Sequence, residues 1–103
     1  MDSGRITIAR TSEEDVRIRQ LVVSVDGKSA GTLLFGDTMT RELDPGRHRL
    51  RVHNTLVWKT IDFELQAGDH ARYTAVNRAG LGTYSMVALL GAGPLYVTIR
   101  RDA

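Results

Sequence analysis

Apolar and polar residues alternate along most of this chain, and short turn sequences interrupt the alternation every several residues. In the first alternating segment, residues 5–10, Ile6 and Ile8 are separated by polar residues. Successive side chains of a β-strand point to opposite faces, so this period of two predicts a strand with both isoleucines in the core. No long segment shows the 3.6-residue period of an amphipathic helix. The sequence therefore predicts short antiparallel strands joined by turns.

Alternation of this kind predicts seven or eight strands. We expect them at residues 5–10, 16–25, 29–35, 38–43, 47–53 and 70–77, around Ile61 and Phe63, and around Leu95, Val97 and Ile99. The inward parity of residues 16–25 changes near Gln20, which predicts a β-bulge there. In residues 70–77 the pattern leaves open whether Tyr73 and Ala75 or their neighbours face the core.

Turn sequences separate these segments. Asp26-Gly27 predicts a type I′ hairpin turn, because both central residues of that turn need positive φ and both residue types tolerate it. Asp44-Pro45-Gly46 predicts a tight reversal of the chain. Two further turns are expected, at Gly36-Asp37 and at residues 66–69.

One pair of strands has a predictable register. If residues 54–57 form a four-residue loop, apolar residues face each other on one side of the hairpin and opposite charges face each other on the other side. The predicted cross-strand pairs are Leu50 with Ile61, His48 with Phe63, Arg49 with Asp62, and Arg47 with Glu64.

The size of the chain limits it to one domain. Its 103 residues, of which 42% are hydrophobic and 25% charged, suffice for one core and are too few for two. We expect a single all-β domain over residues 1–103, an antiparallel β-sandwich of seven or eight short strands of the immunoglobulin or prealbumin type. Residues 79–94 break the rhythm, and this irregular apolar segment is expected to form a loop with a short helical turn or an extra edge strand.

The middle of the chain resembles the PEGA-like small bacterial β-domains. The resemblance covers residues 22–53 and lies in Val23-Ser24-Val25-Asp26-Gly27-Lys28, Gly31-Thr32 and the run from Leu43 through Asp44-Pro45-Gly46-Arg47-His48 to Val52. It implies an accessory or interaction module of uncharacterised function, of a kind commonly attached to envelope or surface proteins. The absence of cysteine and a start that lacks the basic-then-apolar pattern of a secretory signal predict a cytoplasmic location instead.

No residue constellation points to catalysis, so we expect neither an enzyme nor a bound cofactor. His48, His53 and His70 fall on different strands or parities, which argues against a shared metal site. The acidic run Glu13-Glu14-Asp15 lies in a polar segment, and the predicted register pairs Asp62 with an arginine, so these carboxylates are expected to be solvated or ion-paired. The sequence contains neither a Gly-x-Ser-x-Gly elbow nor a phosphate-binding loop.

Arginine dominates the basic residues, although the formal net charge is only +2. Arg47, Arg49 and Arg51 occupy alternate positions and are predicted to project from one sheet face, a candidate basic face that Arg17 and Arg19 would extend. The predicted register places acidic residues opposite this ladder, and few aromatic residues lie among the arginines. Both observations favour a solvated lattice of charges over a nucleic-acid site.

Two apolar clusters supply the candidate interface. It consists of Leu56, Val57, Trp58, Tyr84, Met86, Leu89 and Leu90, which either cap the sandwich or contact a partner. The first hypothesis is a non-catalytic module that binds a protein partner or forms a homo-oligomer. The alternative is a small ligand, a carbohydrate or an anion, bound on the sheet with Trp58, Tyr73 or Tyr84 as a stacking surface. The apolar runs are too short to predict a membrane span.

Overall fold

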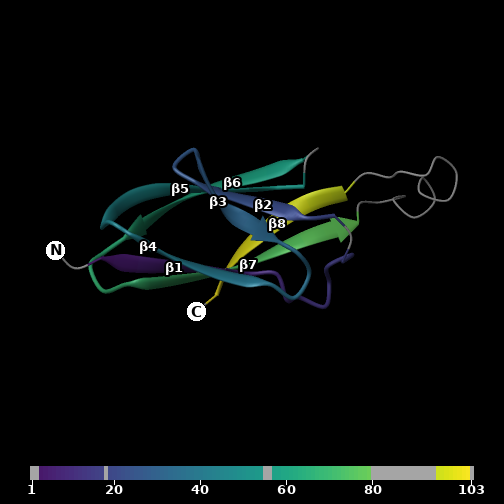
Figure 1. Cartoon of the computed structure of the whole chain (residues 1–103), viewed down its shortest axis with the longest axis horizontal. Helices are drawn as coiled ribbons and strands as arrows, with labels where there is room; N and C mark the ends of the chain where they lie inside the picture. The colour runs from purple at the N-terminus through teal and green to yellow at the C-terminus, as the bar shows by residue number, and fades with distance from the viewer. Residues whose placement is uncertain (1–2, 18, 55–56, 80–94, 103) are drawn as a thin grey trace, which may run out of the picture.

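A computed structural model describes residues 3–17, 19–54, 57–79 and 95–102 of the chain. These residues form eight strands (Figure 1). The strands are β1 (Gly4–Ala9), β2 (Leu21–Val25), β3 (Lys28–Leu33), β4 (Thr38–Leu43), β5 (Gly46–His53), β6 (Trp58–Leu65), β7 (His70–Ala79) and β8 (Leu95–Asp102).

The strands form two four-stranded sheets packed face to face, which confirms the predicted β-sandwich. One sheet has the order β4-β1-β7-β8 and the other β3-β2-β5-β6, and Figure 1 shows them as two layers. All neighbouring strands are antiparallel except β1 and β7, which pair in parallel with Ile6 opposite Ala71. The sequence did not predict this parallel pair, because alternation within a strand carries no information about a partner so distant in the chain.

Local turn chemistry placed most of the strands correctly. Asp26 and Gly27 have φ values of 53° and 83°, as a type I′ turn requires. Residues 54–57 separate β5 from β6, and the register of this hairpin contains all four predicted cross-strand pairs, including Arg49 opposite Asp62 and Leu50 opposite Ile61.

The strand predicted at residues 16–25 is shorter than expected, and this prediction was wrong at its start. Strand β2 begins at Leu21. Arg17 and Arg19 have φ values of 67° and 61°, a left-handed conformation that costs a non-glycine residue about 1–2 kcal/mol. The chain therefore makes an irregular loop before β2, where we had expected a bulge near Gln20.

The inward side chains of both sheets form one core. The fully buried side chains come from β1 and β7 of one sheet and from β2 and β5 of the facing sheet. They are Ile6, Ile8, Leu21, Val23, Leu50, Val52 and Ala75. Tyr73, 2% exposed, lies in the same cluster. The side of β7 that carries Tyr73 and Ala75 therefore faces the core, which decides between the two alternatives that the sequence left open.

The two ends of the sandwich differ. The tight turns at Asp26-Gly27, 44–46 and 66–69 lie at one end, on the left of Figure 1, and we call it the turn end. Residues 10–17, 19–20, 34–37, 54 and 57 lie at the opposite end, which we call the loop end. The segment 80–94, predicted to be irregular, lies outside the described residues.

A buried ion pair organises the loop end. The side chains of Arg10 and Asp15 are both fully buried, with Arg10 Nε 2.9 Å from Asp15 Oδ2 and Nη2 3.1 Å from Oδ1. Burial raises the pKa of Asp15, but the Arg10 guanidinium and the backbone N–H groups of Arg17 and Asn77 outweigh it and lower that pKa below its usual value. Asp15 is therefore ionised and accepts hydrogen bonds on both oxygens.

The same pair connects both sheets. Arg10 Nη1 donates to the backbone oxygens of Arg19, at 2.6 Å, and of Leu33, at 2.9 Å. Asp15 accepts from the N–H of Asn77 in β7, whose side-chain oxygen in turn accepts from Asn54 Nδ2 at 3.0 Å. A bidentate, fully hydrogen-bonded pair of this kind is the arrangement in which burying two charges can be tolerated.

Removing Arg10 should therefore destabilise the protein strongly. We expect Arg10→Met to lower the free energy of unfolding by about 3–5 kcal/mol, because Asp15 is left as an uncompensated buried charge. Arg49→Met, which removes an exposed ion pair at 3.0 Å, should cost about 0–1 kcal/mol. Urea denaturation of both variants measures the difference.

A double variant separates charge from packing. Arg10→Met combined with Asp15→Leu removes both charges, so it should recover part of the loss seen in Arg10→Met. Equal destabilisation by Arg10→Met and Arg49→Met would show that the buried pair contributes no more than a surface pair.

Candidate functional site

The predicted arginine ladder exists on strand β5. Arg47, Arg49 and Arg51 are all exposed, while the alternate residues Leu50 and Val52 are fully buried. Because β5 is a central strand of its sheet, hydrogen-bonded to β2 and β6, the backbone under the arginines is held on both sides. Their Cα atoms are about 7 Å apart along the strand.

Neighbouring strands extend this surface. Ser24 of β2 and Thr60 of β6 flank Arg51 in register, and Trp58 of β6 lies opposite His53. Trp58 is 62% exposed, an unusually high value for the largest apolar side chain. We name this outward surface the arginine face and define it by Ser24, Arg47, Arg49, Arg51, Trp58, Thr60 and Asp62.

The three arginines differ in their partners. Arg49 Nε lies 3.0 Å from Asp62 Oδ1, and this contact lowers the pKa of Asp62. Arg51 Nε donates to the Thr60 hydroxyl at 3.1 Å, a neutral partner. Arg47 lies opposite Glu64 in register, yet the two form no ion pair. Of the three arginines, Arg49 therefore forms an ion pair with the neighbouring strand, while the charge of Arg47 acts on Asp62 from a greater distance.

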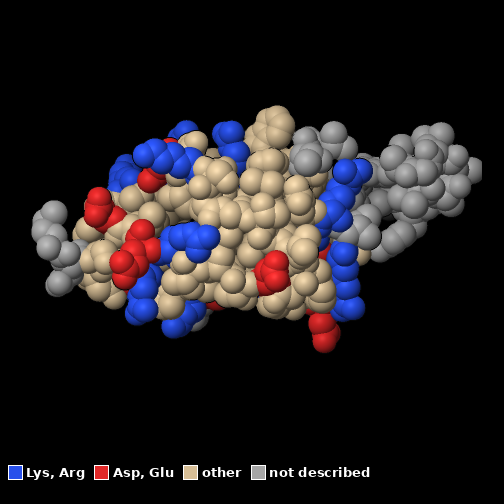
Figure 2. Space-filling view, viewed as in Figure 1, with Lys and Arg blue, Asp and Glu red and all other residues tan. Residues whose placement is uncertain are grey.

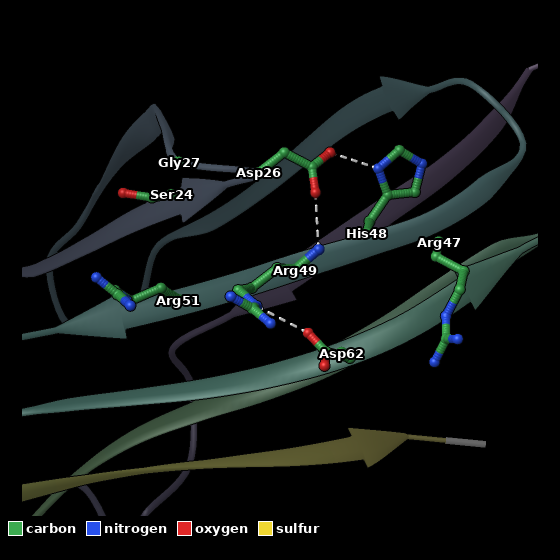
Figure 3. A pocket seen from close by; sticks show the side chains of 8 residues that line it. All are labelled: Ser24, Asp26, Gly27, Arg47, His48, Arg49, Arg51 and Asp62. Carbon is green, nitrogen blue, oxygen red and sulfur yellow. Dashed lines mark hydrogen bonds and ion pairs between the residues drawn. The ribbon is translucent and has the colours of Figure 1, made fainter.

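A groove opens beside the ladder toward the turn end. Figure 3 shows its lining side chains, which are Ser24, Asp26, Gly27, Arg47, His48, Arg49, Arg51 and Asp62. Asp26, in the type I′ turn, accepts a hydrogen bond from the backbone N–H of Arg49 at 2.8 Å. The turn and the middle of the ladder are thus held together.

The contacts of His48 favour its protonated, positively charged form. Its Nδ1 lies 2.6 Å from Asp26 Oδ2, and its Nε2 lies 2.6 Å from the carbonyl oxygen of Asp44. Both partners accept hydrogen bonds, so both ring nitrogens must carry protons. Burial lowers the pKa of His48, but the hydrogen bonds to Asp26 and Asp44 and the charge of Asp26 outweigh it and raise that pKa. As predicted, the ring packs beside Phe63, with ring centroids 5.5 Å apart.

His70, on the outer face of the other sheet, is in the opposite state. Arg72 Nη2 lies 3.3 Å from its Nδ1 and can only donate, so Nδ1 accepts. The remaining N–H, on Nε2, then donates to the Thr7 hydroxyl at 2.6 Å. Desolvation and the charges of Arg72 and Arg5 lower the pKa of His70.

Several other predicted site residues lie elsewhere. Arg17 and Arg19 do not extend the ladder, because they lie in the loop at the loop end. Tyr73 is buried in the core and offers no stacking surface, so that part of the small-ligand prediction was wrong. Of the candidate interface, Val57 is half-buried and Trp58 is exposed. Leu56, Tyr84, Met86, Leu89 and Leu90 lie outside the described residues.

The described part of the chain holds no group of three or more histidine, aspartate or glutamate side chains placed to bind a metal ion. It also contains no helix long and apolar enough to cross a bilayer.

Neither the known protein families nor the curated proteins gave a match to this chain. The likeness to PEGA-like domains therefore stays a prediction. The functional interpretation rests on the arginine face and on the loop end.

Opposite protonation of His48 and His70 is directly measurable. In an NMR titration of the ring protons, we expect His48 to titrate above its ordinary pKa of 6.5 and His70 below it. Substitution of each histidine by glutamine assigns the signals. Titration of His48 below that of His70 would contradict the hydrogen-bond assignment.

The pair of Asp26 and His48 should also give stability a pH dependence. Because the pKa of His48 is raised, its contribution to stability is complete below pH 6.5 and is lost as pH rises through the folded pKa. Because the pKa of Asp26 is lowered, its contribution is complete above pH 3.8 and is lost as pH falls through the folded pKa. Asp26→Asn should therefore cost most between these values, about 0.5–1 kcal/mol, and less at high pH.

Urea denaturation of Asp26→Asn on both sides of this window measures the change. Asp62→Asn is the matched control, because Asp62 pairs with an arginine whose charge does not change over the same range. A cost of Asp26→Asn that is the same at all these pH values would show that the charge of His48 does not contribute to the pair.

Proposed function

We propose that this domain is a non-catalytic interaction module whose arginine face binds an acidic segment of a protein partner. The observation that carries the proposal is the combination of an exposed Trp58 with Arg47 and Arg51, neither of which forms an ion pair with the described residues, on the same sheet face. Tryptophan and arginine are the residues most enriched at the centres of protein interfaces.

The charges of the face favour an acidic partner. Arg51 binds a neutral hydroxyl, and Arg47 forms no ion pair with the residue opposite it, so both guanidinium groups can bind carboxylates bidentately. Arg49 is already matched by Asp62 and would contribute less. Because adjacent arginines of the ladder are about 7 Å apart, an extended partner segment with acidic residues at every second position would match their spacing.

Trp58 supplies apolar area next to these charges. It precedes Thr60 by two positions on the outward side of β6, the strand that pairs with the ladder. We infer that an apolar side chain of the partner packs on the indole ring while neighbouring acidic residues contact Arg51.

A displayed peptide library tests this proposal. Selection on the wild-type protein should enrich acidic peptides that contain an apolar residue, and Trp58→Ala should weaken their binding by about 2 kcal/mol, or about 30-fold in Kd. Arg51→Ala should weaken binding and reduce its dependence on salt. Isothermal titration calorimetry with a selected peptide measures both effects.

Arg72→Ala is the matched control, since Arg72 is an exposed arginine on the outer face of the other sheet. It should leave the peptide affinity unchanged. Peptides that bind Trp58→Ala, Arg51→Ala and Arg72→Ala equally well would overturn the proposal. A wild-type protein that sediments as a dimer and loses this state on Trp58→Ala would identify a second copy as the occupant of the face.

A carbohydrate is the second candidate ligand, favoured by one observation. Ser24, Arg51 and Thr60 form a row of hydrogen-bonding groups beside the exposed indole ring, and sugar rings stack on aromatic faces while their hydroxyl groups bind such polar neighbours. Binding on a glycan array that is lost in Trp58→Ala and kept in Arg47→Ala would favour a sugar over an acidic peptide.

A further inference from the structure

The loop end carries a second basic surface, separate from the arginine face. A hollow there is lined by Arg17, Arg19, Gln20, Leu34, Phe35 and Asn54. Figure 2 shows a band of Lys and Arg side chains across this end of the sandwich. None of these six residues belongs to the arginine face, so the two surfaces can be tested independently.

The backbone beneath the hollow is fixed from inside the protein. Arg17 and Arg19 both adopt the left-handed conformation, which arginine rarely adopts without support. That support comes from the buried ion pair, since Asp15 Oδ1 accepts from the Arg17 N–H at 2.7 Å and Arg10 Nη1 donates to the Arg19 carbonyl at 2.6 Å. The loop therefore projects its two arginine side chains from a defined position.

Neighbouring acidic residues do not neutralise these arginines. Asp15 is engaged by Arg10, Glu14 forms an ion pair with Arg78 at 2.7 Å, and Asp37 accepts from the backbone N–H of Leu34. Within the part of the chain that the structure describes, neither Arg17 nor Arg19 forms an ion pair. Their two positive charges thus remain available in one hollow.

The hollow also offers an apolar surface. The Arg17 guanidinium lies 4.5 Å from the centroid of the Phe35 ring. Stacking of this kind orients the guanidinium plane and leaves its N–H groups free to bind an oxyanion at the edge. Leu34, which also lines the hollow, is 59% exposed.

We propose that this hollow binds an oxyanion, a phosphate or a carboxylate, that is carried by a ligand with an apolar group. Arg17 and Arg19 bind the anion as bidentate donors, and Gln20 supplies a further N–H donor. The apolar group packs on Leu34 and Phe35.

An NMR titration of the full chain tests the proposal. Phenyl phosphate, inorganic phosphate and N-acetylglutamate are each added at constant ionic strength, and the Arg Nε–H and backbone N–H signals are followed. We expect saturable shifts at Arg17, Arg19 and Gln20, with phenyl phosphate binding more tightly than inorganic phosphate. Arg17→Gln combined with Arg19→Gln should weaken binding at least about tenfold.

Arg47→Gln combined with Arg51→Gln is the matched control and should leave these affinities unchanged. If this double variant loses peptide binding and still binds the oxyanion, the hollow and the arginine face are separate sites. Saturation by phenyl phosphate and inorganic phosphate, but not by N-acetylglutamate, would assign a phosphate-bearing ligand, and saturation by N-acetylglutamate would assign a carboxylate. Inorganic phosphate binding as tightly as phenyl phosphate would overturn the apolar part of the proposal. Shifts that do not saturate with any of the three compounds, or that persist in the Arg17 and Arg19 double variant, would overturn the proposal. An unchanged urea midpoint in each variant confirms that the fold is intact.

Discussion

The buried pair of Arg10 and Asp15 is the interaction on which the loop end depends. It lies where four segments meet, and its hydrogen bonds reach the end of β3, the residues before β2 and the C-terminal part of β7. Since β7 and β3 belong to different sheets, one ion pair joins the two layers. Its two charges are tolerated only as a pair, because either one alone would be desolvated without compensation. The positions of Arg17 and Arg19 follow from this constraint.

Sequence patterns predicted those features of the fold that nearby residues determine. The Asp26-Gly27 turn was predictable because few residue types accept positive φ at both positions. The register of β5 and β6 was predictable because one loop length satisfies both faces of the hairpin, and a shift by one residue would move Leu50 to the surface. The arginine ladder followed directly from this register, and so did the place of His48 beside Phe63.

Features that depend on distant residues could not be predicted from these patterns. Val16 and Ile18 alternate with polar residues, although out of phase with β2, so the sequence favoured a strand with a bulge there. The contacts of Asp15 that hold this segment in another conformation are visible only in three dimensions. A carboxylate in a polar run gives no local sign that it is buried. The contact between Asp26 and His48 joins residues 22 positions apart, in a turn and a strand that alternation alone does not bring together.

The chemistry of cross-strand neighbours, more than the number of arginines, determines what the arginine face can bind. Arg49 and Arg51 have the same side chain and are both exposed, yet one faces a carboxylate and the other a hydroxyl. A bound anion would compete with Asp62 for Arg49, whereas at Arg51 it would replace only a neutral hydrogen bond. Because β5 and β6 hold these pairs in a fixed register, the pattern of matched and unmatched charges is a property of the folded sheet. We therefore expect the binding that we propose for this face to depend most on the place where Arg51 and Trp58 lie on adjacent strands.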